Sequence, residues 1–281
     1  MHKCSITIDG SPFCFNVEGQ VSLGNDEVLY NPNGVISKTS WQTEGFTVAD
    51  IFNEDDIKQL IDGTTQLLVS LFDELGINCP ASFTLEQYHR VVTTDEQHQA
   101  VIKHTRTLTN DRFPINLDNV ASRVSTIINR TVSGNNADLM RLTNKTENVI
   151  LRISRPGHMD LNPLHRDGYL DVWKNVLNVW IPIAGCTKQT SLTLIPGSHL
   201  WNEASILRTD CFGASIVGNR YSVPAIVAAD QPLSCVRPNP HIGQALLFTP
   251  FIIHGAGINQ TDDITRFSFE LRLYDEECVE I

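Results

Sequence analysis

The sequence predicts an α+β protein whose all-β core is buttressed by helices from the N-terminal part of the chain. From about residue 147 onwards, short runs rich in β-branched and aromatic residues alternate with Pro and Gly. Before that point, most apolar residues follow a helical spacing. No linker separates the two parts, so we expect a single domain over residues 1–281, with a mainly helical segment at 1–146 and the β core at 147–281.

The clearest predicted helix spans residues 53–75. Its apolar residues recur at helical spacing, Asn53 can cap the first turn, and Gly76 can end the last one. Three further segments have weaker helical patterns, namely 84–92, 94–108 and 117–132. The first part of the chain is therefore expected to be helical after two short strand-like runs at 5–8 and 13–17.

Six runs in the second part are expected to be strands: 148–154, 176–184, 191–195, 234–237, 244–249 and 265–274. Short strands in this number, with turn residues between them, favour an antiparallel sandwich or a small barrel.

Composition limits the possible partners. The formal charge of the 281-residue chain is -11, and no cluster of Lys and Arg offsets it, so nucleic acid is not an expected partner. No apolar run is long enough to span a membrane, and the first residues do not resemble a signal peptide, so we expect a cytoplasmic protein. The seven cysteines form no C-x-x-C pair and are expected to be reduced. Nothing in the sequence indicates the oligomeric state.

The stretch NPLHRDGYLDVW, residues 162–173, contains a histidine and an aspartate with one residue between them. In an extended segment, side chains at i and i+2 point to the same side, so His165 and Asp167 can bind one metal ion such as Fe(II). A kinase catalytic loop also contains H-R-D, but it needs an Asn where this chain has Val172, and no D-F-G follows. A metal site is therefore the favoured interpretation, although H-x-D alone is a weak motif.

A third metal ligand could come from His254, which ends the apolar run in FTPFIIHGAG just before Gly255. Taken alone, a buried histidine after a strand is more often structural. Twelve residues later, the segment 266–273 alternates between an apolar and a polar face. Such a polar face is usually solvated, but in a barrel it can line the interior, where Arg266 and Ser268 would bind a carboxylate.

Together these motifs resemble the Fe(II)/2-oxoglutarate-dependent oxygenases, and among them the phytanoyl-CoA dioxygenase-like (PhyH) family. The resemblance covers about residues 148–274. It rests on HRD at 165–167, NVWIPI at 178–183, SLTLIPGSH at 191–199, GQALLFTPFIIHGAGIN at 243–259 and RFS at 266–268.

The resemblance implies a double-stranded β-helix, also called a jelly roll or cupin-like fold. It implies that His165, Asp167 and His254 are the iron ligands. Arg266, helped by Ser268, would bind the distal carboxylate of 2-oxoglutarate.

Other residues are matched less directly. Arg152 is the nearest candidate for binding the other end of 2-oxoglutarate, although it can equally contact substrate or solvent. Ala256 stands where relatives often have a hydroxyl group, so a contact with 2-oxoglutarate there would be missing or supplied by Ser268. His199 resembles a turn element of the family rather than a ligand.

The implied reaction consumes O2 and 2-oxoglutarate, releases succinate and CO2, and hydroxylates a C–H bond of a small polar metabolite, such as an amino acid, a sugar or a natural-product intermediate. Related halogenases have a small residue in place of Asp167, so its presence favours hydroxylation. Segment 201–233 is expected to form a loop over the mouth of the active site, together with parts of the helical first half. It contains no pattern typical of an acyl-chain tunnel, so a coenzyme A thioester is not assumed.

Three alternatives remain. Arg266 and Arg272 form an R-x5-R pattern that occurs in nucleic-acid demethylases of the wider superfamily, but the acidic charge argues against such a substrate. A cupin-type metal-dependent isomerase would not need Arg266 and Ser268. A non-catalytic binding barrel would have no reason to keep three metal ligands beside Arg266.

Overall fold

The computed structural model describes residues 1–32, 34–37, 39–131, 142–143 and 149–275. Its largest sheet is antiparallel throughout and has six strands. In spatial order these are β4 (Phe46–Asp50), β13 (Gln244–Phe248), β7 (Val176–Ala184), β14 (Arg266–Asp275) and then β6 (Ile150–Ser154) and β5 (Leu142–Thr143), which both pair with β14.

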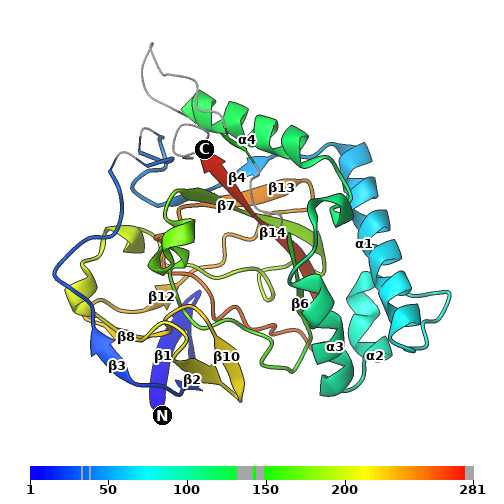
Figure 1. Cartoon of the computed structure of the whole chain (residues 1–281), viewed down its shortest axis with the longest axis horizontal. Coiled ribbons are helices and arrows are strands. Elements are labelled where there is room, and N and C mark those ends of the chain that lie inside the picture. The colour runs from blue at the N-terminus through cyan, green and yellow to red at the C-terminus, as the bar shows by residue number, and fades with distance from the viewer. Residues whose placement is uncertain (33, 38, 132–141, 144–148, 276–281) are drawn as a thin grey trace.

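Smaller sheets lie on the other side of the molecule from the helices (Figure 1). They consist of β11 (Ile226–Ala229), β8 (Ile206–Thr209) and β3 (Val21–Leu23); of β12 (Ser234–Cys235), β1 (His2–Ile8) and β2 (Ser11–Val17); and of a hairpin, β9 (Ala214–Ile216) with β10 (Asn219–Tyr221). The central space of the molecule is a pocket lined by residues of β6, β7 and β14 from the largest sheet and of β10 from the hairpin. The predicted α+β class, with a mostly antiparallel double-stranded β-helix, is confirmed.

Four helices cover the outer face of the largest sheet: α1 (Glu54–Glu74), α2 (Tyr88–Val91), α3 (Asp95–Thr105) and α4 (Leu117–Thr131). Helix α1 begins at a capping box, in which the Asn53 side chain accepts from the Asp56 amide and the Asp56 carboxylate accepts from the Asn53 amide. It ends at Leu75, and Gly76 follows in the left-handed region at φ 66°. The predicted bounds of this helix are confirmed. No helix in the described part of the chain is long and apolar enough to cross a membrane.

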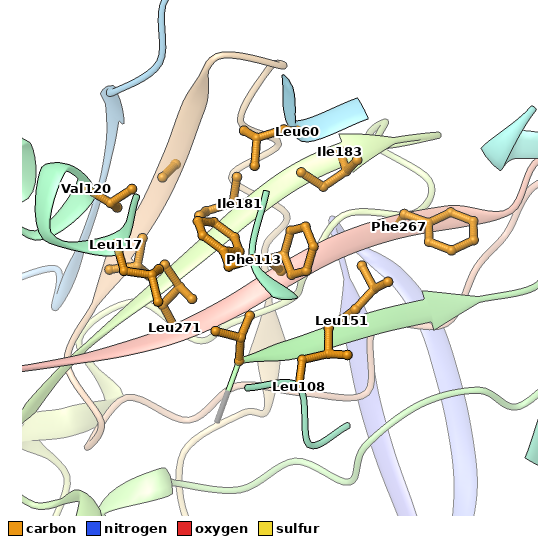
Figure 2. Close-up of a cluster of buried hydrophobic side chains, with 14 of the residues drawn as sticks. Leu60, Leu108, Phe113, Leu117, Val120, Leu151, Ile181, Ile183, Phe267 and Leu271 are labelled. Carbon is orange, nitrogen blue, oxygen red and sulfur yellow. The ribbon is translucent and has the colours of Figure 1, made fainter. Parts of the chain in front are cut away.

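The hydrophobic core lies between these helices and the sheet (Figure 2). Phe267, Phe269 and Leu271 project from one face of β14 and are at most 2% exposed. Phe269 meets the ring of Phe113, which precedes α4, with centroids 4.9 Å apart and planes at 81°. The apolar face predicted for this strand therefore packs against helices.

Some expected elements differ. Segment 191–195 forms no strand and has only isolated bridges at Leu194. Segment 201–233 is not one loop, because it contains the four short strands β8 to β11. Strands of three or four residues are too short for their alternation to be visible in a sequence. The division at residue 147 stays a prediction. Strands from the two parts nevertheless pair with each other, since β4 pairs with β13 and β3 with β8.

Replacing Phe269 with Ala should lower the free energy of unfolding by about 3–5 kcal/mol, because it removes a fully buried ring and leaves a cavity beside Phe113. Chemical denaturation measures this loss. Val172→Ala is the control, since Val172 is 66% exposed and its truncation should change stability by less than about 0.5 kcal/mol. Equal effects of the two substitutions would contradict the packing described here.

Candidate active site

His165, Asp167 and His254 come together in the central space. His165 and His254 face each other in an isolated β-bridge, with N···O distances of 2.9 and 3.0 Å between their backbones. The candidate ligand atoms of the three side chains all lie within 4.8 Å of one another, and all three residues are buried. The structure thus brings together two candidate ligands from one short segment and a third from 87 positions further along the chain.

Both histidines present the same ring nitrogen to this cluster. Nδ1 of His165 lies 2.8 Å from the carbonyl of Pro163, and Nδ1 of His254 lies 3.1 Å from the carbonyl of Ile252. Because a carbonyl only accepts, each Nδ1 carries a proton, and Nε2 is the nitrogen of each ring that is left to bind a metal. Burial, together with the neighbouring His165, lowers the pKa of His254 to about 4, so it is neutral at pH 7. Neutral imidazole is the form that binds metals.

Asp167 is oriented by two residues to which the sequence gave no role at the metal site, Asn178 and Arg272. Its Oδ2 accepts from Nδ2 of Asn178 at 3.0 Å and from Arg272 at 3.1 Å, while Oδ1 lies 3.4 Å from Nε2 of His165. Burial raises the pKa of Asp167, but the contacts of the carboxylate, above all that with the guanidinium of Arg272, outweigh it and hold that pKa well below its usual range. The carboxylate is therefore ionised and has one oxygen directed at the histidines.

The contacts of Asn178 and Arg272 with Asp167 were not predicted, because they depend on which residues lie opposite each other in the sheet. The two residues are register partners on β7 and β14. One signal was available, since Asn178 is the single strongly polar residue in the run VLNVWIPIA. Arg272, the second arginine of the R-x5-R pattern, thus forms an ion pair with Asp167.

Arg166, between the two predicted ligands, is fully buried and points elsewhere. Its Nη1 lies 2.8 Å from Oε1 of Glu203, whose Oε2 lies 3.0 Å from Nε of Arg208. Its Nη2 donates to the carbonyl of Ser198 at 2.7 Å. These contacts attach the segment that contains the candidate ligands His165 and Asp167 to the layer that contains β8.

Arg266 is buried on the inner face of β14 and is 6% exposed, so the interpretation of this face as solvated is wrong. Its Nη1 donates to the Ser268 hydroxyl at 2.6 Å, and its guanidinium carbon lies 5.7 Å from the centre of the Trp180 ring. No carboxylate of the described residues lies within ion-pairing distance, and Nε has no hydrogen-bond partner among them. A buried cation without a counter-ion is costly, so this position suits an anionic ligand.

Arg152, by contrast, already has an acidic partner. It lies opposite Ser268 in the sheet, and its Nη2 lies 2.9 Å from Oε2 of Glu270. This ion pair lines the same pocket as His165, His254 and Arg266.

The pocket also receives residues from outside the β core. Helix α3 contributes His98 and, just after its end, Arg106. From segment 201–233, only the hairpin β9–β10 reaches the pocket, through Asn219 and Tyr221. Of the segment and the helical half that were expected to cover the mouth of the active site, one hairpin and one helix line the pocket.

His199 lies outside this site, as expected. Its Nε2 is 2.9 Å from the carbonyl of Gln42, and its ring packs edge-on against Tyr30. Six cysteines are free in the described part of the chain, and Cys278 lies outside it.

Two histidines and a carboxylate in a jelly roll define the class of non-haem, Fe(II)- and 2-oxoglutarate-dependent oxygenases. The sequence matches the family profile described as Phytanoyl-CoA dioxygenase (PhyH) over residues 41–268, and the chain belongs to this family. The donor set agrees with this membership, because neutral imidazole and carboxylate ligands suit Fe(II). No curated protein matches the sequence significantly.

Solved structures are similar to this chain at low sequence identity, and the first of them shares its fold. EctD from S. alaskensis, crystallised with 2-oxoglutarate and 5-hydroxyectoine, is 16% identical and has a TM-score of 0.51, with 93% of this chain and 84% of that chain covered. The apo form of ThoJ, a non-heme monooxygenase, is 15% identical with a TM-score of 0.47 and coverage of 86% and 77%. The carbocyclase SnoK from nogalamycin biosynthesis is 13% identical with a TM-score of 0.43 and coverage of 90% and 88%.

His98, in the wall of the pocket, should make the stability of the protein depend on pH. Burial lowers the pKa of His98 to about 4, an effect that Asp160 opposes. Because the folded protein binds this proton more weakly than the unfolded chain does, the stability that neutral His98 gives above about pH 6.5 is lost as pH falls towards 4.

Between pH 7 and pH 4, His98→Gln should therefore lose up to about 3 kcal/mol less of its unfolding free energy than the wild type. Denaturation curves at the two pH values measure the difference. His104→Gln, an exposed position on the same helix, is the control and should follow the wild type. A His98→Gln curve parallel to the wild type would contradict the prediction.

Proposed function

We propose that this protein hydroxylates a C–H bond of a small polar metabolite, with His165, Asp167 and His254 binding Fe(II) and with Arg266 and Ser268 binding the distal carboxylate of 2-oxoglutarate. The observation that carries the proposal is the buried guanidinium of Arg266, which lacks a carboxylate partner among the described residues and lines the same pocket as the two histidines.

The side chains of the chain itself prepare the site. Asn178 and Arg272 hold one oxygen of Asp167, so the other remains available for the metal. The backbone carbonyls beside the two histidines fix their tautomers. Fe(II) bound there would supply the redox chemistry that couples the oxidative decarboxylation of 2-oxoglutarate, with O2 as the oxidant, to oxidation of the substrate. Three protein ligands leave coordination positions open for the two cosubstrates.

Arg266 is suited to a dicarboxylate for a geometric reason. Its fork of N–H donors matches a carboxylate, and the Ser268 hydroxyl, which already accepts from Nη1, has its own proton to donate. Trp180 covers the guanidinium on one side and excludes water there. Binding in this dry position strengthens the charge pairing.

The polar lining of the pocket supports a small polar substrate. Arg106, Asp160, Tyr221 and Glu270 all contribute to the wall. The carboxylate of Asp167 supports hydroxylation rather than halogenation. A cupin-type isomerase would leave the arrangement of Arg266 and Ser268 without a purpose, and a simple binding barrel would have no reason to keep three candidate metal ligands beside Arg266.

Anaerobic protein mixed with Fe(II) and 2-oxoglutarate should give the weak visible charge-transfer band of the chelate, and oxygen should then produce succinate. His165→Ala should abolish both, because it removes one of the three ligands. Absorbance spectroscopy and succinate assays measure these outcomes. His158→Ala is the matched control, since His158 is part of no metal-binding group in the described structure. A wild-type protein with neither band nor succinate would refute the proposal.

Arg266→Ala should weaken 2-oxoglutarate binding about 10- to 100-fold, because a charge-assisted interaction is lost from a buried position. Titration of the charge-transfer band gives the dissociation constant. Arg112→Ala removes an arginine outside the pocket and should leave that constant unchanged. An unchanged constant in Arg266→Ala would rule out this residue as the carboxylate partner.

A further inference from the structure

The pocket is rich in arginine. Four arginines and two carboxylates line it: Arg106, Arg152, Arg266 and Arg272, with Asp160 and Glu270. The chain as a whole carries a formal charge of -11, so this concentration of cations is opposite in sign to the rest of the protein. The charged side chains of the wall differ in whether they have an ion-pair partner within the protein.

Most of these charges are already matched. Arg272 lies 3.1 Å from Asp167, and Arg152 lies 2.9 Å from Glu270. Asp160 is bound by Arg155, whose Nε lies 2.8 Å from Oδ2. These pairs leave no net charge for a ligand to neutralise.

Two guanidinium groups of the wall remain without a carboxylate partner among the described residues, those of Arg266 and Arg106. The first is assigned to 2-oxoglutarate by the proposed function. Arg106 is the cap residue that ends α3, and its guanidinium makes no hydrogen bond or ion pair with any described residue. Helix α3 lies beside β6, which brings Arg106 to the pocket (Figure 1).

The end of the helix does not by itself require this arginine. A cation near a helix C-terminus is favourable, but Lys103 already places one in the last turn of α3. Arg106 is also exposed, whereas Arg266 is buried deep in the pocket. The two free cations are therefore separated along the pocket, one at its mouth and one in its interior.

We propose that the substrate is a small molecule with a carboxylate group, and that Arg106 binds this carboxylate at the mouth of the pocket while the rest of the molecule extends towards His165 and His254. The Arg152–Glu270 pair is neutral as a unit, so it contacts polar parts of the substrate without selecting for charge. Arg106 is then the residue that determines specificity for an acid. This proposal rests on the proposed function and narrows its substrate.

The test uses a panel of small carboxylic acids, each assayed beside its primary amide, with stimulated succinate release as the readout. At least one acid should stimulate release, and its amide should do so far less. Arg106→Gln should raise KM for that acid about tenfold or more, because one charge-assisted interaction is lost. Lys103→Gln is the matched control, since it removes the same charge from the same helix outside the pocket lining and should leave KM unchanged.

The proposal is overturned if only amides or cationic compounds stimulate release, if no acid does, or if Arg106→Gln and Lys103→Gln have the same KM. The charge-transfer band of the wild type, recorded with Fe(II) and 2-oxoglutarate alone, separates the two hypotheses. A protein without the band fails the proposed function, whereas a protein with the band and without selectivity for acids fails only the present inference. A dissociation constant for 2-oxoglutarate that changes with Arg106→Gln would also count against a role confined to substrate.

Discussion

Burial of both faces of β14 is the constraint on which the rest of the structure depends. One face packs Phe267 and Phe269 against the helices, and the other turns Arg266, Glu270 and Arg272 into the pocket. Because side chains alternate along a strand, a shift of one residue would exchange the two sets. It would place two guanidinium groups in the hydrophobic core. The packing that stabilises the fold therefore also fixes the register of the site.

Charges buried by this arrangement need partners, and the partners do more than balance charge. Removing one member of a buried ion pair is strongly destabilising, although an intact pair often adds little to stability. The contact of Arg272 with Asp167 is therefore better understood as an orienting interaction than as a source of stability. The same holds for Arg166 with Glu203, which binds the metal-ligand segment to the opposite layer. The site is preorganised by interactions that exist before any ligand binds.

Sequence reasoning succeeded where a signal was local or long. Helix α1 was predicted from spacing and capping, and the β-rich texture gave the fold class. His165, Asp167 and His254 were predicted as iron ligands from spacing and from resemblance to a family, and the structure brings these three side chains together. Asn178 could not be assigned a role, because its contact with Asp167 depends on which residue lies opposite it in the sheet. The short strands β8 to β11 escaped because three or four residues show no clear period.

The distribution of roles among the elements explains why the motifs reveal the reaction class more readily than the substrate. Every residue to which the proposed function gives a role in binding the metal or 2-oxoglutarate lies on the β core or directly beside it. Arg106 and Tyr221 come instead from a helix end and a hairpin at the edge of the pocket. Such elements can change without disturbing the register of β14, so specificity can vary while the chemistry is kept. A cation without a hydrogen-bond or ion-pair partner among the described residues, as Arg106 is, is then the informative feature, because its interaction has been left to the ligand.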